Sequence, residues 1–184
     1  MQRESHSESP VDTEIESQIE SSIRSQTKSV SDLVGVLRAH GEYRLIALKP
    51  IARHQHLFRI EGDETCTPTR YSVQIGRGRH LDLRPGRPTE ELLDHFYWQY
   101  LNHHCEPSTM IRDLEVVALR DIARWEDVTF NYNTTEYEMA EPFQCRCGSP
   151  LCARVIRGAR HMSQAELERL RPIIVSTGRE DLLP

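Results

Sequence analysis

No stretch of this 184-residue sequence stays apolar over the ~20 residues that a membrane-spanning helix requires. The amino end has no basic start followed by an apolar run, so no secretory signal is evident. The formal net charge of −5 offers no positive field to nucleic acid or anionic lipid and suits a basic partner better. These absences predict an intracellular protein with no membrane association and no direct nucleic-acid binding. We expect it in the cytoplasm, with the nucleus as the alternative.

A disulfide framework is not expected either. The chain has five cysteines, at Cys66, Cys105, Cys145, Cys147 and Cys152. An odd number of cysteines without a secretory signal argues for a reducing compartment, where clustered cysteines are more often metal ligands. The cluster near the carboxyl end is therefore the first candidate for a functional feature.

Apolar side chains are also scarce in residues 1–32, which are rich in Ser, Glu and Gln. Such a segment cannot bury enough apolar surface to offset the entropy that it loses on ordering. We therefore expect a disordered tail. The spacing of Ile15, Ile19 and Ile23 leaves open the alternative of a short amphipathic helix that docks on a partner.

From about residue 33 onward the sequence contains short strand-like segments with β-branched or aromatic residues, separated by Pro, Gly and Asp. The expected strands are Arg44–Leu48, His56–Ile60, Tyr71–Ile75, His80–Leu83, Glu115–Leu119 and Asp127–Tyr132. Many short strands with few helices predict a β-rich α+β domain built from small packed sheets.

Two helices are expected among these strands. Thr89 is a candidate cap for a helix over Glu90–Tyr100. Ser163 and Glu166 have the spacing of a capping box, which predicts the start of a second helix. Pro172 is expected to end that helix, because proline lacks the backbone N–H that a helix interior needs.

The cysteines near the carboxyl end have the spacing of a metal site. Cys145 and Cys147 are separated by one residue, and Cys152 follows a turn that contains Gly and Pro. Three thiolates at this spacing can converge on a tetrahedral zinc ion at ~2.3 Å each. The fourth position is either open or filled by another residue, and Cys105 is the best candidate because all-thiolate sites suit structural zinc. Cys66 has no neighbouring ligand in the sequence and is expected to take no part.

Three motifs in series resemble those of the SET-domain protein-lysine methyltransferases. Asn102–Pro107 is similar to the Asn-His-x-Cys-x-Pro motif of that family, and Asp127–Tyr132 resembles the strand that ends in its catalytic tyrosine. Pro142–Cys152 is similar to the post-SET zinc element. The resemblance implies a SET fold with a pseudoknot. The implied parts are a tail over 1–32, a SET domain over 33–140, a post-SET zinc element over 141–158, and a C-terminal helix and tail over 159–184.

The resemblance also implies roles for individual residues and two bound groups, S-adenosylmethionine and a structural Zn²⁺. The catalytic residue would be Tyr132, the cofactor-binding residues Asn102, His103 and Phe143, and the zinc ligands Cys105, Cys145, Cys147 and Cys152. Arg44 and Tyr71, outside the three motifs, are also expected to bind the cofactor. The substrate would be a lysine in a protein or peptide. Phe143 would cover the cofactor or the lysine channel.

The chemistry of methyl transfer explains why these residue types are needed. The attacking lysine must be neutral although its free pKa is ~10.4, and a narrow aromatic channel beside a sulfonium disfavours the ammonium form. The hydroxyl of Tyr132 would orient the amine rather than act as a general base, because a phenol of pKa ~10 is poorly matched to that task. Phe130, two residues earlier, matches a position of the SET family where Phe, rather than Tyr, tends to leave room for more than one methyl group on the lysine.

One segment departs from the family pattern. SET domains usually open with Gly-x-Gly before an Ala, but Glu42 and Arg44 stand at the glycine positions when the chain is aligned on Ala47. A charged side chain there would either pair with the cofactor carboxylate or fill the space of the cofactor. The main hypothesis is therefore a protein-lysine N-methyltransferase. The alternatives are a SET scaffold used for binding or small-molecule chemistry, and a zinc-dependent interaction module without a pocket.

Overall fold

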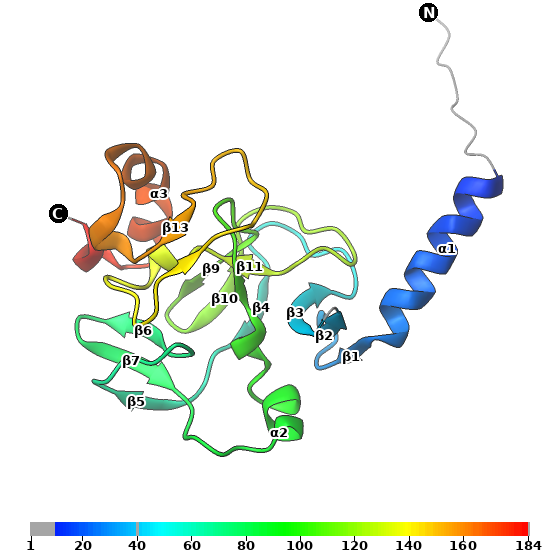
Figure 1. Cartoon of the computed structure of the whole chain (residues 1–184), viewed down its shortest axis with the longest axis horizontal. Helices are drawn as coiled ribbons and strands as arrows, with labels where there is room; N and C mark the ends of the chain where they lie inside the picture. The colour runs from blue at the N-terminus through cyan, green and yellow to red at the C-terminus, as the bar shows by residue number, and fades with distance from the viewer. Residues whose placement is uncertain (1–9, 40, 184) are drawn as a thin grey trace, which may run out of the picture.

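The computed structural model describes residues 10–39 and 41–183. Within them, small β-sheets joined by loops form the body, with few helices (Figure 1). The first three-stranded sheet contains β1 (Thr27–Ser29), β2 (Val34–Ala39) and β3 (Glu42–Ala47). The second contains β4 (His56–Arg59), β10 (Glu115–Ala118) and β9 (Thr109–Arg112). The third contains β5 (Asp63–Thr65), β7 (Arg79–Asp82) and β6 (Val73–Gly76). The two-stranded sheets are β8 (Asn102–His103) with β11 (Thr129–Phe130), and β12 (Phe143–Gln144) with β13 (Val155–Ile156). This architecture confirms the predicted β-rich α+β class.

The main hydrophobic core joins apolar side chains from all three of the larger sheets. Val36 of β2 faces Leu45 of β3 in register, and both side chains are buried. Val116 of β10 is fully buried in the same cluster. An antiparallel bridge between Ile51 and Ile122 connects the chain after β3 with the chain before β11. The core therefore fixes the positions of the segments that lead into the two short strands β8 and β11.

The six expected strands overlap β3, β4, β6, β7, β10 and β11. Strands β2 and β9 were not expected, because both are buried along most of their length and lack the alternation that reveals a half-buried strand. Strands β1, β5, β8, β12 and β13 have only two or three residues each. Such short segments contain too little periodicity to be recognised from sequence.

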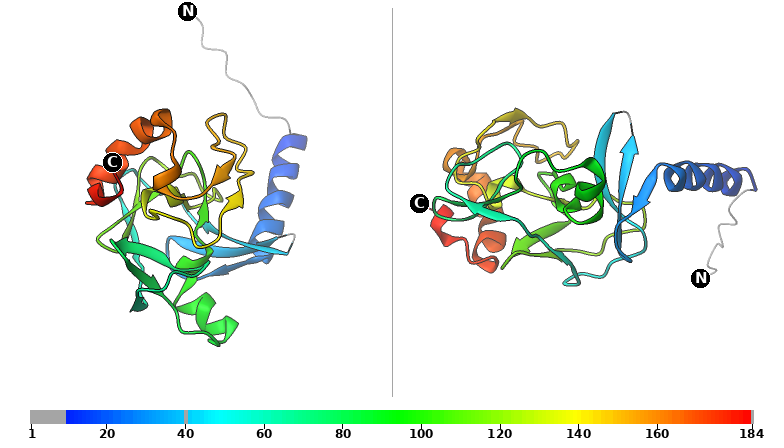
Figure 2. Two further views of the ribbon diagram at one scale, coloured as in Figure 1. Left: turned by 60° about the vertical axis from the view of Figure 1, so that its left-hand side comes forward. Right: turned by 90° about the horizontal axis from the view of Figure 1, so that it is seen from below.

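The expected disordered tail is wrong for Pro10–Ser25, which forms helix α1. Residues 1–9 of that tail lie outside the described residues. The helix agrees with the alternative that the isoleucine spacing left open, and Glu20 on it forms an ion pair with Arg124 at 2.8 Å. The strand β1 that follows pairs with β2, so the sheet begins before residue 33. Both views in Figure 2 place α1 at the opposite end of the molecule from the C-terminus.

The single helix expected after Thr89 is divided in two. Helix α2 (Thr89–Asp94) ends early, and a separate 3-10 helix covers Tyr97–Tyr100. Thr89 lies inside α2 instead of capping it. The reason for the break is Trp98, which is buried and donates its indole N–H to the carbonyl oxygen of Glu61 at 2.9 Å. Burial of this side chain overrides the helical propensity of the segment.

Helix α3 (Gln164–Ser176) begins as predicted, with Ser163 and Glu166 forming a capping box. The prediction that Pro172 ends it is wrong, because the helix continues through the proline for four more residues. Leu170 and Ile174 on one face are buried against Leu182, and this burial offsets the ~3 kcal/mol that an interior proline costs. No helix in the described part of the chain is both long enough and apolar enough to cross a membrane.

Candidate functional site

The site is built where two short strands from distant parts of the chain lie side by side. Strands β8 and β11 run parallel, so that Asn102 pairs with Thr129 and His103 with Phe130. The backbone N–H of His104 then donates to the carbonyl oxygen of Phe130 at 3.1 Å and extends the pairing. This pairing brings the Asn-His segment next to the segment that ends in Tyr132.

Tyr132 lies in a cluster of aromatic rings immediately after β11. Its ring centroid is 4.7 Å from Phe130, 5.2 Å from His103 and 5.9 Å from Phe143. Its hydroxyl donates to the carbonyl oxygen of Leu101 at 2.9 Å. The phenol therefore has one fixed orientation, with its oxygen directed at the backbone that enters β8.

The electrostatics of this cluster keep its titratable groups uncharged. Burial, and secondarily the carboxylate of Glu136, raises the pKa of Tyr132 above its ordinary value, so the phenol is protonated at neutral pH. Burial, His104 and Arg169 lower the pKa of His103 to about 3, so its imidazole is neutral. The phenol of Tyr132 and the imidazole of His103 are therefore both neutral at neutral pH, and the role of Tyr132 in catalysis stays a prediction.

The hydrogen bonds of His103 define its tautomer. Its Nδ1 accepts the backbone N–H of Tyr132 at 3.2 Å. A neutral imidazole has one N–H, so the proton must lie on Nε2. That nitrogen is 3.2 Å from the sulfur of Cys105, which is therefore the acceptor. His103 thus connects the aromatic cluster to the cysteine cluster.

The other predicted cofactor-binding residues divide into two groups. Phe143 contacts the cluster through Tyr132 and His103, and the side-chain amide of Asn102 donates to the carbonyl oxygen of Tyr43 at 3.0 Å. Arg44 instead forms an ion pair with Asp127 at 3.0 Å, with 41% of its side chain exposed.

Tyr71 is not brought into the aromatic cluster. It is 61% exposed on the loop between β5 and β6, with its ring against the guanidinium of Arg70. Arg70 itself is near enough to lower the pKa of Tyr132, against the larger effect of burial. Tyr71 therefore lies beside the region of the site, and its cofactor role stays a prediction.

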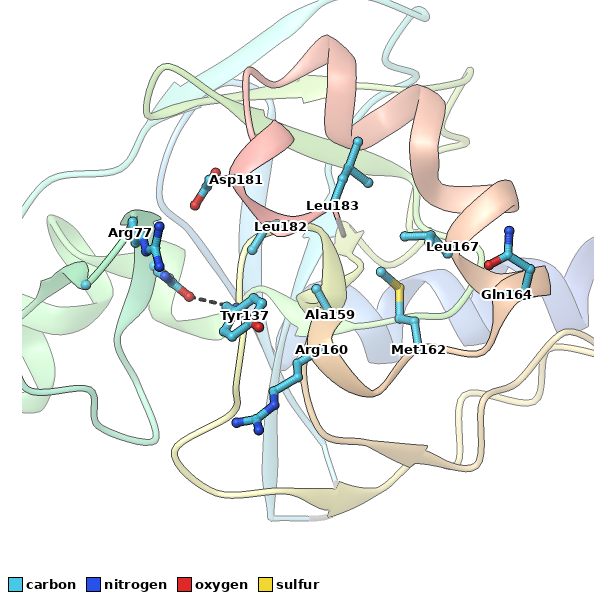
Figure 3. Close-up of a pocket in the computed structure, with 12 residues that line it drawn as sticks. Arg77, Tyr137, Ala159, Arg160, Met162, Gln164, Leu167, Asp181, Leu182 and Leu183 are labelled. Carbon is cyan, nitrogen blue, oxygen red and sulfur yellow. Dashed lines mark hydrogen bonds between the residues drawn. The ribbon is translucent and has the colours of Figure 1, made fainter.

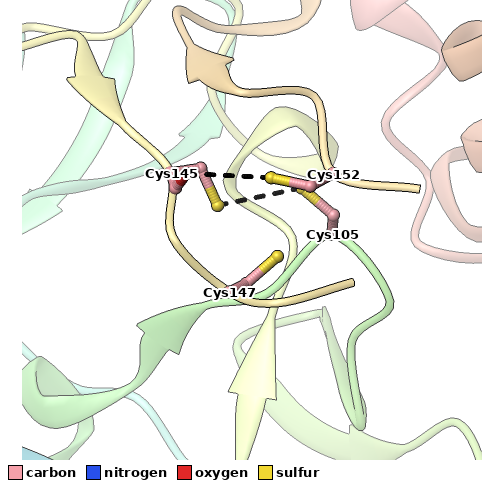
Figure 4. A group of neighbouring side chains, drawn as sticks. All are labelled: Cys105, Cys145, Cys147 and Cys152. Carbon is pink, nitrogen blue, oxygen red and sulfur yellow. Dashed lines mark hydrogen bonds between the residues drawn. The ribbon is translucent and has the colours of Figure 1, made fainter. Parts of the chain in front are cut away.

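The four predicted zinc ligands do converge. The sulfur atoms of Cys105, Cys145, Cys147 and Cys152 all lie within 4.8 Å of one another (Figure 4). A tetrahedral ion with Zn–S distances of ~2.3 Å would place its sulfurs ~3.8 Å apart, and the Cys105 and Cys145 sulfurs are 3.9 Å apart. The group can therefore hold a metal ion, and Cys66 is exposed outside it.

Three thiols of this group differ in their pKa values. Burial raises the pKa of Cys105 to about 11 and that of Cys145 further still. Burial acts in the same direction on Cys147, but hydrogen bonds outweigh it and lower its pKa to about 6. Without a metal ion, Cys105 and Cys145 are therefore neutral thiols near pH 7, and a metal would have to displace their protons, because cysteine binds metals as the thiolate.

Two residues that the sequence reasoning missed support the cysteine cluster. Arg169 of α3 donates to the carbonyl oxygen of Cys105 at 2.6 Å, and His104 Nε2 is 3.1 Å from the carbonyl oxygen of Cys147. Such contacts orient metal ligands through their backbone. His104 could have been inferred from its place beside His103, whereas Arg169 lies 64 residues away and has no local signal.

A second polar network, also missed, connects the segment after Tyr132 to the C-terminal residues. The buried carboxylate of Glu136 accepts the backbone N–H of Gln74 at 2.7 Å, and the Gln74 side chain accepts the N–H of Tyr137 at 2.7 Å. The buried guanidinium of Arg179 donates to the Gln74 carbonyl oxygen and pairs with Asp181. Burial raises the pKa of Glu136 to about 7.

The backbone at Gly158, after the cysteine element, passes close to the segment that follows Tyr132. Gly158 has φ 105°, and its N–H donates to the side chain of Asn133 at 3.1 Å. A Cβ at this glycine would lie 2.6 Å from the carbonyl oxygen of Tyr137, so any side chain would push the two segments apart. The residues after the cysteine element are therefore packed directly against the residues that follow Tyr132.

Comparison with known proteins agrees with this geometry. The chain matches the SET domain family over residues 12–133 and therefore belongs to that family. It is 34% identical over 102 residues to the methyltransferase flvH of Aspergillus flavus, covering 53% of this chain and 51% of that protein. It is 33% identical over 86 residues to the H3 lysine-36 specific histone-lysine N-methyltransferase of Aspergillus oryzae, covering 39% and 9%. The chain thus spans about half the length of the first relative.

A solved structure supports the fold independently. The crystal structure of KRYPTONITE in complex with mCHG DNA and SAH superposes with a TM-score of 0.50 at 17% identity, covering 65% of this chain and 28% of that one. At this identity the likeness shows the fold alone. The family expected from the three sequence motifs, and the SET fold that it implies, are confirmed.

Proposed function

We propose that this chain is an S-adenosylmethionine-dependent methyltransferase that acts on a lysine of a protein or peptide. The observation that carries the proposal is the position of Tyr132, a neutral phenol among three aromatic rings with its hydroxyl fixed by the Leu101 carbonyl oxygen. It stands at the point where the parallel strands β8 and β11 end. The membership in the SET domain family supports the same reaction.

The residues around Tyr132 fit a cationic cofactor. S-adenosylmethionine, when bound, supplies the methyl group and a positively charged sulfonium. The site offers aromatic rings and oxygen acceptors, and both attract a cation. Asn102 and His103 enter it from β8, and Phe143 closes it from β12. We assign these three residues to cofactor binding. At the two positions that are usually glycine, Glu42 is exposed and Arg44 is turned to Asp127.

The aromatic walls also prepare the substrate. An ammonium group loses hydration on entering a site lined by Phe130, Tyr132 and Phe143, which lowers its pKa and favours the neutral amine. The Tyr132 hydroxyl donates its hydrogen bond to the carbonyl oxygen of Leu101. The lone pairs of its oxygen are then free to accept an N–H of the substrate amine and to orient it. Positioning the amine in line with the methyl group lowers the activation barrier by several kcal/mol. This corresponds to a rate increase of the order of 10²–10⁴.

We further propose that the metal held by the four cysteines is zinc and that its role is structural. All four ligands are thiolates, and a four-cysteine tetrahedral site leaves no open position for a substrate. The site is connected to the aromatic cluster through the hydrogen bond between His103 and Cys105. Zinc would thus fix the wall that carries Phe143.

The proposal is tested by assaying S-adenosylhomocysteine formation with recombinant histone H3 as the lysine-rich acceptor. Tyr132→Phe should lower the rate at least about 100-fold, because it removes the oriented hydroxyl and leaves the ring in place. Tyr97→Phe is the matched control, since this phenol lies outside the cluster, and it should retain activity. Equal rates for the two variants would contradict the role of Tyr132.

Calorimetric titration separates cofactor binding from lysine transfer. Zinc-replete protein should bind S-adenosylmethionine, and Asn102→Ala should weaken this binding. Binding without transfer to any lysine would favour the second candidate function, a SET scaffold that acts on a small molecule. The charged pair of Arg44 and Asp127 at a usual glycine position is the observation that favours this second candidate. Imaging of the tagged protein would test our proposal of the cytoplasm against the nucleus.

A further inference from the structure

A pocket of about 570 Å³ lies away from the aromatic cluster, between the β6–β7 turn, the segment after Tyr132 and the C-terminal residues. Figure 3 shows Arg77 on one side of it, Met162 and Leu167 on the other, and Tyr137 and Leu182 between them. Neither Tyr132 nor Asn102 lines it. Its size falls in the range of ~300–1,000 Å³ that is usual for small-molecule sites.

One wall of this pocket is apolar and well supported. Leu167 of α3 and Leu182 are buried, while Met162 and Leu183 are partly exposed. The buried members belong to, or lie beside, the small C-terminal core around Ile174. A wall of this kind offers burial to an apolar group of a ligand.

Most polar groups of the pocket already have partners within the protein. The Gln74 side chain accepts from the Tyr137 N–H and donates to the Gly76 carbonyl oxygen, and Gln164 donates to Glu168. The charged side chains Asp181 and Arg160 are paired with Arg179 and Glu138. A ligand would therefore gain little by displacing them.

Arg77 differs from these residues. It is exposed at the tip of the β6–β7 turn, and no ion pair joins it to a carboxylate among the side chains of residues 17–39 and 41–183. With Asp181 neutralised by Arg179 and Arg160 by Glu138, the unmatched charge of the pocket is one positive charge. A guanidinium at the rim of a pocket that has one apolar wall suits a carboxylate or sulfonate oxygen pair.

We propose that this pocket binds a small molecule that has an apolar body and one negative charge. The apolar body lies against Met162, Leu167 and Leu182, and the anionic group faces Arg77. The site is separate from the proposed methyl-transfer site. Tyr137, which lines the pocket, is held by the side chain of Gln74 and belongs to the segment that follows Tyr132 in the chain.

The test uses two fluorescent probes with closely similar ring systems and the full, zinc-replete chain. Anilinonaphthalene sulfonate carries one negative charge, and N-phenylnaphthylamine carries none. Both should bind, and Arg77→Gln should weaken the sulfonate about threefold and leave the neutral probe unchanged, as expected for a partly exposed ion pair. Arg53→Gln, at an exposed arginine outside the pocket, is the matched control and should change neither affinity.

A second variant tests the apolar wall. Met162→Glu should weaken both probes at least about tenfold, because it places a carboxylate against their rings. Circular dichroism should show that Met162→Glu is folded. If Met162→Glu does not fold, the comparison of the two probes with Arg77→Gln still tests the proposal. Equal effects of Arg77→Gln on the two probes, or displacement of either probe by S-adenosylmethionine, would overturn the proposal.

Discussion

The body of the molecule and its cysteine element are held together by different forces. The main core of the body contains eighteen buried apolar residues in one cluster. In the cluster that contains the cysteine element, the buried members are Cys105, Cys145 and Ile156. Burial at ~25 cal/mol per Å² can hold the first region, but the second has little apolar surface to bury. The difference teaches that a hydrophobic core can account for the frame of the molecule, whereas the cysteine element has too small a core and would depend on the proposed metal.

Removal of the metal should have the largest effect and should be confined to one region. Structural zinc contributes on the order of 10 kcal/mol to ordering its segment, so chelation should release residues 141–158. Arg146, Arg154 and Arg157 would then become sites of tryptic cleavage. Mass spectrometry of the fragments should show these cuts first, while the body stays intact.

Single cysteine variants sharpen this prediction. Cys152→Ser should reproduce the effect of chelation in the presence of zinc, because it removes one of four ligands. Cys66→Ser is the control, since Cys66 is exposed and outside the cluster, and it should leave the tryptic pattern unchanged. Simultaneous cleavage throughout the body after chelation would break the comparison, because the body would then depend on the metal as well.

A cavity in the core of the body should have the next largest effect. It should destabilise the body and leave the cysteine element with its zinc. Ile51 is 1% exposed in the main core, and truncation of such a side chain costs about 2–5 kcal/mol. Ile51→Ala should lower the free energy of unfolding in urea by this amount. Its zinc content, measured with a chromogenic chelator, should stay stoichiometric. Loss of zinc from the folded variant would show that the two regions are coupled.

The boundary between the regions should show a pH dependence through Glu136. Burial raises its pKa to about 7 from 4.5, so the native state retains a proton that the unfolded chain releases above pH ~4.5. Stability should therefore fall as the pH rises towards ~7 and level off above it. Glu136→Gln stays neutral and should remove this component, worth up to about 3 kcal/mol between pH ~5 and ~8.

Besides the backbone N–H of Gln74 and the phenol of Tyr132, the groups near Glu136 include His80, Arg179 and Thr135. Burial and Arg179 lower the pKa of His80, which acts in the opposite direction, since stability is lost as the pH falls below its unfolded value. The contribution of zinc is common to both proteins, whereas that of His80 is coupled to Glu136, 3.9 Å away. The difference in unfolding free energy between wild type and variant therefore reports the titration of Glu136 together with this coupling. A difference independent of pH would show that the carboxyl group is already ionised.

The parts of the site that could be predicted from sequence are those where neighbouring residues act together. The spacing of Cys145, Cys147 and Cys152 has a geometric meaning within one loop, and the convergence of their sulfurs with that of Cys105 was predicted in full. Tyr132 was predicted because its segment resembles a family strand, although the strand itself has only two residues, and its catalytic role stays a prediction.

The rest could not be predicted, because it depends on contacts between distant residues. Arg179 reaches the carbonyl oxygen of Gln74 across 105 positions, and neither residue carries a local pattern. The continuation of α3 through Pro172 depends on burial of Ile174 against the C-terminal residues. In each case tertiary packing decides between conformations that local sequence leaves similar in energy.

The smallest expected effect on stability is that of a surface charge in the body, and it tests the predicted cofactor role of Arg44. Arg44 pairs with Asp127 at 3.0 Å, and both side chains are about two-fifths exposed, so the pair contributes only about 0.2–1 kcal/mol. Arg44→Gln should therefore leave the unfolding free energy nearly unchanged. Because Asp127 holds the guanidinium, the Kd for S-adenosylmethionine should also change by less than about threefold.

A loss of affinity of tenfold or more in calorimetry would instead show that Arg44 leaves Asp127 to pair with the cofactor carboxylate. The sequence expectation would then be right, and the charge at the usual glycine position would belong to the binding site.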